Sequence, residues 1–248
     1  YKFDHTPVDN WPSDYAKLAE FSRRGVLVLL ADSTNVETPG WAPSERVIDG
    51  ALSQVFDQAP GRIIVASFAS HISRIQQVAR AAANHKRKIA FIGTSMVENV
   101  KMARQLDYLE LEESMVVPAD NALRLPDKEV VLMVTGSQGE PTSIMGRLAA
   151  GTNRTFDIKE GDTVVLSATP IPGNEESVYR VINHLYQRGA NVIYGETSPV
   201  HVSGHASQEE MKLLIHLTQP KFFIPIHGEL RMLKQHGQLA ESLGIPAG

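Results

Sequence analysis

Three polar residues, far apart in the sequence, have types that could do chemistry together. Asp32 and His227 each follow directly after an apolar run, and His205 lies in a short polar loop. In layered α/β sheets, catalytic and metal-binding side chains gather where strands end. A carboxylate and two imidazoles brought together by folding could bind a metal ion or move a proton on a phosphate ester. The sequence therefore predicts a site made of Asp32, His205 and His227.

Asp32 and the His205 loop also have structural interpretations. Asp32 could be a turn residue whose side chain accepts local backbone N–H groups, and both interpretations stay open. Gly204 lets the backbone bend or approach a ligand, which favours a functional role for His205. His201 is expected to support the loop instead. Ser207 is predicted to cap the helix that follows, whose free N–H groups would suit an anion such as phosphate.

His227 follows a strand pattern that contains Pro225, which is typical of an edge strand or a strand end. The histidine could be a simple cap, but a buried strand seldom ends in an imidazole without a partner. We therefore interpret His227 as a metal ligand, with Glu229 as the residue that orients it.

Three loops could hold a phosphate backbone, each between a predicted strand and a predicted helix. They span residues 68–71, before a helix that carries Arg74, residues 135–141 and residues 167–175. Each loop taken alone is explained as an ordinary turn between a strand and a helix. Three on one side of a sheet favour a polar crevice.

The elements that must position these residues alternate along the chain. Strands are predicted at residues 26–31, 62–66, 88–91, 130–134, 163–167, 191–194 and 222–226. Helices are predicted at residues 13–24, 44–58, 73–84, 96–106, 143–149, 174–188, 208–217 and 231–243. This alternation predicts an α/β fold, with βαβ units and a mainly parallel sheet flanked by helices.

Composition restricts the class of protein only weakly. The 248 residues can bury one large core or two modest ones, and 42% of them are hydrophobic. No apolar stretch approaches the ~20 residues of a membrane span, so no membrane partner is expected. Cysteine is absent, which excludes disulfides and thiolate zinc sites and is compatible with a cytoplasmic location. A net charge of −4 neither supports nor excludes RNA binding.

Taken together, the segments around Asp32, His205 and His227 resemble the beta-CASP group of metallo-β-lactamase-fold nucleases. The segments 68–70, 136–141 and 170–175 narrow the resemblance to ribonuclease J, over nearly the whole chain. It implies a beta-CASP domain at residues 44–198, enclosed by metallo-β-lactamase-fold segments at residues 1–43 and 199–248, which together form a partial lactamase sandwich.

The resemblance also implies roles for individual residues. His227 would ligate one of two zinc ions, His205 would assist proton transfer or oxyanion stabilisation at the scissile phosphate, and Asp32 would support a neighbouring histidine. The remaining implied residues would hold the RNA backbone and its 5′-monophosphate. They are Ser70, Arg74, Ser203, Gly204, Ala206 and Ser207.

The family carries most of its metal ligands in a His-x-His-x-Asp-His motif, and this sequence contains no His-x-His. We therefore expect a segment of a longer protein that does not hold the two zinc ions alone and is inactive alone. The full-length protein is expected to be a cytoplasmic 5′-to-3′ exoribonuclease and endoribonuclease, and a homodimer or higher oligomer. In the segment, strands 26–31 and 222–226 should expose apolar surface that promotes self-association.

Two other functions are considered. The chain could be a non-catalytic RNA-binding or assembly module, which metal content would distinguish from an enzyme. A nucleotide-binding doubly wound domain is disfavoured, because no glycine-rich loop has the Rossmann spacing.

Overall fold

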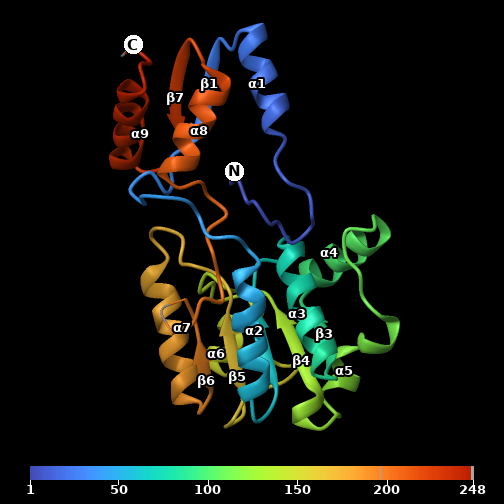
Figure 1. Cartoon of the computed structure of the whole chain (residues 1–248). Coiled ribbons are helices and arrows are strands. Elements are labelled where there is room, and N and C mark those ends of the chain that lie inside the picture. Colours follow the sequence, from blue (N-terminus) through green and yellow to red (C-terminus); the bar gives the residue numbers. More distant parts are fainter. Residues whose placement is uncertain (196, 247–248) are drawn as a thin grey trace. The chain divides into compact units, whose positions relative to one another are not determined.

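A computed structural model describes residues 1–195 and 197–246 (Figure 1). The chain divides into two compact units. Unit 1 combines both ends of the sequence, Tyr1–Glu45 and Val202–Gly248, and unit 2 is the continuous stretch Arg46–His201.

Unit 2 is built around a five-stranded sheet in which every pairing is parallel. Its spatial order is β3-β4-β2-β5-β6. Every residue of the three inner strands is buried, as expected for a parallel sheet covered on both faces. The strands are β2 (Ile63–Ala66), β3 (Lys88–Ile92), β4 (Val130–Val134), β5 (Thr163–Leu166) and β6 (Asn191–Ile193).

Helices cover both faces of this sheet (Figure 1). On one face, α6 (Ile144–Ala150) and α7 (Glu175–Gln187) pack in a continuous apolar cluster with the strands. On the other face, α2 (Val47–Gln58) and α3 (Ile72–Asn84) contact each other. The remaining elements of unit 2 lie between β3 and β4 in the sequence. They are α4 (Thr94–Gln105), α5 (Ala119–Ala122) and two 3₁₀ turns, η1 (Glu113–Met115) and η2 (Asp127–Glu129).

Unit 1 contains a parallel pair of strands, β1 (Val28–Asp32) and β7 (Phe222–Ile226). Its helices are α1 (Tyr15–Arg24), α8 (Gln208–Thr218) and α9 (Leu230–Ser242). Helix α9 packs on β7, and α8 packs on α1. The side chain of Asp14 caps α1 by accepting a hydrogen bond from the Lys17 amide.

One face of the β1–β7 pair is apolar and exposed. Alternation along each strand places every second side chain on this face. The exposed fractions are 37% for Val28, 53% for Leu30, 49% for Phe222, 48% for Ile224 and 39% for Ile226.

The predicted fold class is confirmed: this is a mixed α/β chain whose sheets are parallel and flanked by helices. Each predicted strand and helix is present, with ends that differ by at most three residues. The sequence did not predict α5 or the two 3₁₀ turns, which are too short to show a periodic pattern. None of the described helices combines the length and the apolar character needed to cross a membrane.

Candidate functional site

The ends of β1 and β7 bring the predicted residues of unit 1 together. Asp32 closes β1 opposite Ile226, and His227 is the next residue of the second strand. Because the strands run parallel, their carboxyl ends share one edge. One ligand atom from each of Asp32, His205 and His227 lies within 4.8 Å of the other two.

Asp32 holds His205 by a short hydrogen bond. Its Oδ2 lies 2.6 Å from Nδ1 of His205, and its Oδ1 accepts from the amide of Thr34 at 3.0 Å and lies 2.7 Å from the Thr34 hydroxyl. Burial favours the neutral acid, but these hydrogen bonds outweigh it and hold the pKa of Asp32 well below its ordinary value. A charged Asp32 therefore fixes the orientation of the imidazole.

The loop that carries His205 is fastened to the turn after β1. The side-chain amide of Asn35 donates through Nδ2 to the Ser203 hydroxyl at 2.8 Å and to the His205 carbonyl at 3.1 Å. The Ser203 hydroxyl also accepts from the His205 amide at 3.1 Å. Ser203 thus acts as a local brace, and Gly204 between the two residues is exposed.

His227 lies beside His205 with its side chain exposed. The ring centroids are 5.4 Å apart and the rings are stacked, with an interplanar angle of 26°. The backbone of His227 has a φ of 53°, a left-handed conformation that is uncommon for a residue other than glycine and typical of strained functional turns.

The donor set fits a divalent metal. Two imidazoles and a carboxylate are ligands that zinc accepts, and their donor atoms converge on one region. The hydrogen bond between Asp32 and His205 occupies Oδ2 of Asp32 and Nδ1 of His205. No hydrogen bond among the described residues involves the His227 ring.

Ser207 caps α8 as predicted, but two other expectations about nearby groups are not met. Glu229 lies 3.2 Å from Nε of Arg231 and makes no described hydrogen bond to His227, so it does not orient that ring. The first amides of α8, those of Gln208 and Glu209, donate to the carbonyls of Thr38 and Gly40 and are not free for an anion. The N-terminus of α8 is closed by a capping box between Ser207 and Glu210. The buried Glu210 carboxylate accepts from three backbone amides, those of Phe3, Ala42 and Ser207, so the Ser207 amide is already occupied.

Ala206 and Ser207 face the interior of unit 1. Ala206 is fully buried in an apolar cluster with Val36, Met211 and Met232, and Ser207 is 2% exposed. Neither side chain can meet RNA in this structure. Because the Ser207 amide donates to Glu210 and its carbonyl accepts from Met211, only the backbone of Ala206 is left for such a contact.

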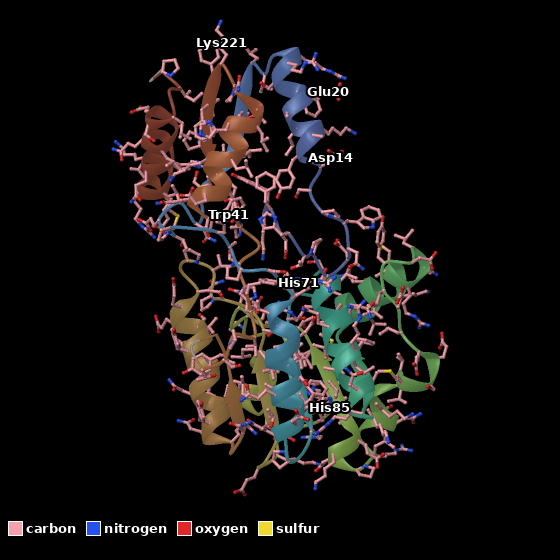
Figure 2. All side chains as sticks on the ribbon, viewed as in Figure 1. Asp14, Glu20, Trp41, His71, His85 and Lys221 are labelled. Carbon is pink, nitrogen blue, oxygen red and sulfur yellow. The ribbon has the colours of Figure 1, made fainter. Side chains whose placement is uncertain are left out.

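In unit 2, Ser70 and Arg74 lie near the carboxyl ends of the central strands. The chain leaves β2 towards β3 but leaves β5 towards β6, so the direction of the connections reverses between β2 and β5, the position at which open α/β sheets generally bind ligands. Ser70 is exposed there, just before His71 and the start of α3 (Figure 2).

Arg74 is fully buried. Its guanidinium donates to the Val200 carbonyl at 2.7 Å and to the Ser167 hydroxyl. The geometry therefore favours Arg74 as an anchor for the end of unit 2 over a direct contact with phosphate.

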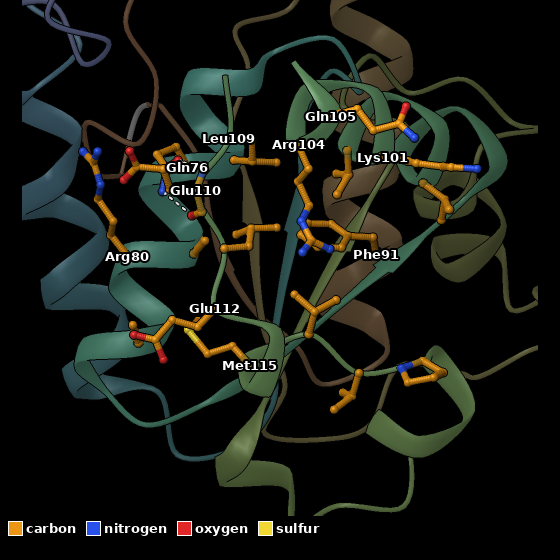
Figure 3. Close-up of a pocket in the computed structure, with 18 of the residues that line it drawn as sticks. Gln76, Arg80, Phe91, Lys101, Arg104, Gln105, Leu109, Glu110, Glu112 and Met115 are labelled. Carbon is orange, nitrogen blue, oxygen red and sulfur yellow. Dashed lines mark hydrogen bonds between the residues drawn. The ribbon is translucent and has the colours of Figure 1, made fainter. Parts of the chain in front are cut away.

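A cavity of about 1100 Å³ also lies in unit 2, between α3, α4 and residues 107–119 (Figure 3). Arg80, Lys101 and Arg104 contribute cations to its lining, and Asp107, Glu110 and Glu112 contribute anions. The predicted site residues do not line this cavity, and its balanced charge does not favour a polyanion such as RNA.

Several supporting residues were not predicted from the sequence. They are Ser33, Thr34, Asn35, Glu210 and His236. Thr34 and Asn35 stand two and three residues after Asp32, and this nearness in the sequence is a local indication that they support it. Glu210 stands three residues after Ser207, the spacing of a capping box, which was also a local signal. His236 acts from the middle of α9, and only the folded contacts identify it.

Comparison with known proteins identifies the family of this chain. Residues 60–185 match the family described as Ribonuclease J, beta-CASP domain, and residues 192–247 match the Zn-dependent metallo-hydrolase RNA specificity domain. The chain is 48% identical over 247 residues to a ribonuclease J of Synechocystis sp., covering 100% of this chain and 39% of that protein. It is 49% identical over 246 residues to a ribonuclease J of Thermus thermophilus, covering 99% of this chain and 43% of that protein.

A ribonuclease J2 of Bacillus subtilis is 43% identical over 245 residues, covering 99% of this chain and 44% of that protein. The chain thus spans about two fifths of the length of the curated relatives that it matches. Because the beta-CASP match alone extends over half of the sequence, the chain belongs to the ribonuclease J beta-CASP family.

Proposed function

We propose that this chain is part of a zinc-dependent ribonuclease that hydrolyses RNA phosphodiesters, as a 5′-to-3′ exoribonuclease and an endoribonuclease. The observation that carries the proposal is the convergence of donor atoms from Asp32, His205 and His227 within 4.8 Å, in a chain that belongs to the ribonuclease J family. Two of these residues are 173 positions apart in the sequence, so only the fold unites them.

His227 is the proposed metal ligand. Its imidazole is exposed and has no hydrogen bond among the described residues that would compete with a metal. Zinc, when bound, supplies Lewis acidity for the phosphodiester and activates water. The match to a Zn-dependent metallo-hydrolase domain over residues 192–247 supports a metal cofactor. We propose two ions in the full-length protein, not held by these 248 residues alone.

His205 is the proposed proton-transfer group. Asp32 occupies its Nδ1, which leaves Nε2 as the nitrogen available to a phosphate oxygen. An imidazole held in this way can donate a proton or stabilise a developing oxyanion. Asp32 sets the tautomer and the direction of the ring and does not need to touch the substrate.

RNA is the proposed substrate, preferably with a 5′-monophosphate. Ser70 and Gly204 are exposed, and Ser203 shapes the His205 loop, so these three are the proposed contacts. Ala206 would contribute through its backbone, because its side chain is buried, and Ser207 would act indirectly, by capping α8 and fixing the end of the His205 loop. Arg74 would act indirectly, by holding the carbonyl of Val200.

We assign residues 44–198 to the beta-CASP domain and residues 1–43 and 199–248 to the metallo-β-lactamase fold. A cytoplasmic location and a homodimer or higher oligomer complete the proposal for the full-length protein. An assembly module without chemistry is the alternative, and metal-dependent turnover separates the two.

The test is RNA hydrolysis by the full-length protein with 5′-monophosphorylated and 5′-triphosphorylated substrates. We expect faster cleavage of the monophosphorylated RNA, loss of cleavage with a chelator and recovery when zinc is returned. The 248-residue chain alone should cleave neither substrate. Binding of RNA without metal-dependent cleavage by the full-length protein would favour the assembly module.

A further inference from the structure

A buried hydrogen bond joins α9 to the turn that follows β1. Nδ1 of His236 lies 2.9 Å from the hydroxyl of Ser33, and both residues are fully buried. His236 lies in the middle of α9, and its ring also meets the edge of Phe223 on β7, with centroids 4.8 Å apart. The contact therefore connects three elements of unit 1.

Ser33 lies at the centre of the candidate site, although its side chain faces away from solvent. Its amide donates to the carbonyl of Ile226 at 2.9 Å and lies 3.4 Å from the carbonyl of His227, which continues the β1–β7 ladder beyond the last strand residue. Asp32 precedes Ser33, and the hydroxyl of Thr34, which follows it, lies 3.1 Å from the carbonyl of His227. A shift of Ser33 would therefore move both the carboxylate and the turn that carries His227.

The surroundings of Ser33 leave little room for such a shift to be absorbed. A Cβ at Gly228 would lie 3.2 Å from the Cβ of Ser33 and 3.2 Å from the Cβ of Met232. The other ring nitrogen of His236, Nε2, is buried and has no hydrogen-bond partner among the described residues. Burying an unpaired polar atom is unfavourable, so an apolar residue would be the simpler choice if packing were the only requirement.

We propose that His236 is a positioning residue for the nuclease site. By holding the Ser33 hydroxyl, it fixes the turn from which Asp32 orients His205 and the neighbouring turn that presents His227. It cannot touch the substrate, because it is fully buried. Only the expected effect of His236 on RNA turnover rests on the proposed function. The structural part concerns the geometry of Asp32 and His205 in this chain.

The test uses three variants. His236→Phe keeps the ring volume and removes the hydrogen bond, whereas His236→Asn keeps a polar atom near the position of Nδ1. His216→Phe is the matched control, because His216 is an exposed histidine on α8 of the same unit. If His236→Phe does not fold, Ser33→Ala removes the same hydrogen bond from the other side and takes its place.

The first readout is the NMR signal of the His205 Nδ1 proton in the short hydrogen bond to Asp32, recorded on the 248-residue chain. We expect this downfield signal to broaden or disappear in His236→Phe, to persist in His236→Asn and to be unchanged in His216→Phe. An unchanged signal in His236→Phe, or in Ser33→Ala where that variant replaces it, would overturn the proposal. A purely structural role would lower stability without this selective change.

The second readout is RNA turnover by the full-length protein. Residues that support a metal site from outside typically contribute about 10- to 100-fold to activity or metal affinity. We expect His236→Phe to lower kcat by about this factor with little change in KM, and His236→Asn to recover most of it. A wild-type protein without turnover would contradict the proposed function alone, since the NMR result would still decide the positioning role. Turnover unchanged in His236→Phe would overturn that role.

Discussion

Asp32 uses both carboxylate oxygens in ways that serve its neighbour. Oδ1 is engaged by Thr34 within the same turn, which fixes the carboxylate plane, and Oδ2 faces Nδ1 of His205. Such an arrangement converts a flexible imidazole into one with a set tautomer and direction, which is the requirement for a proton-transfer group. His227 contributes the complementary property, an exposed ring next to the first. His205 is therefore the oriented imidazole of the pair, and His227 is the accessible one.

His236 predicts a specific pH dependence of stability. Burial lowers its pKa from 6.5 to about 4, although the negative charge of Asp32 acts in the opposite direction. The unfolded chain therefore binds a proton between pH 6.5 and 4 that the folded chain does not, and stability falls as the pH falls through this window. The loss should reach about 3 kcal/mol.

Urea unfolding between pH 7 and pH 4 measures this loss, with His236→Phe as the comparison. His236→Phe should lack most of the decline in the free energy of unfolding that the wild-type chain shows between pH 6.5 and pH 4. The Asp32 contribution is separable, because a lowered carboxylate pKa supports stability that is lost only below about pH 4. Equal slopes for both proteins between pH 6.5 and 4 would contradict the assignment.

The β1–β7 pair and its two turns position the site as a single element. Parallel pairing places Asp32 next to Ile226, and the turn after β7 then folds back against Ser33. Gly228 permits this close approach because any side chain there would press on Ser33 and Met232. The site thus depends on a short turn that leaves no room for a side chain at Gly228.

Gly228→Ala should therefore destabilise unit 1 by about 1–3 kcal/mol, the usual range for overpacking a tight contact. Gly204→Ala is the matched control, since a Cβ there would meet nothing within 4 Å. Chemical denaturation of both variants gives the comparison. Equal stabilities would show that the turn yields to the extra methyl group at no cost.

The sequence predicts elements well and contacts between them poorly. The strand pattern at residues 222–226 identifies β7 with both ends correct, because β-branched and aromatic residues are bounded by a turn. The pairing of β7 with β1, almost two hundred residues earlier, follows only from the fold or from the resemblance. The Ser207-x-x-Glu210 spacing is a capping-box signature, but nothing local in the sequence predicts that Glu210 also accepts from the amides of Phe3 and Ala42.

Arg74 illustrates the same limit for the candidate site. The resemblance implies a phosphate contact for Arg74 in the first turn of α3, yet its guanidinium is buried against Ser167 and Val200. Periodicity places a residue on a helix but does not say which neighbour satisfies a long polar side chain. By contrast, Asp32, His205 and His227 converge as predicted, since strand ends restrict where a side chain can lie.

At the scale of the whole molecule, unit 1 is assembled from both ends of the chain, with unit 2 between them in sequence. This order makes the candidate site depend on correct pairing of distant segments. It also leaves the β1–β7 pair with one apolar face in solvent, on which five large side chains are between 37% and 53% exposed. Contiguous apolar surface of this kind usually marks an interface.

The isolated 248-residue chain should therefore self-associate, as measured by light scattering over a range of concentrations. Leu30→Glu combined with Ile224→Lys places opposite charges on neighbouring positions of the exposed face and should reduce association. Leu230→Glu, on an exposed residue of α9, is the control and should have little effect. A monodisperse wild-type monomer would contradict this prediction.

His227 is assigned to metal binding and His205 to proton transfer. Zinc content and turnover of 5′-monophosphorylated RNA, measured in full-length His205→Ala and His227→Ala, test this division of roles most directly. We predict about two zinc ions per wild-type chain. His205→Ala should retain this zinc, with turnover reduced by about 10²- to 10⁴-fold, whereas His227→Ala should lose about one zinc ion per chain together with its turnover. Wild-type zinc content and turnover in His227→Ala would contradict the account.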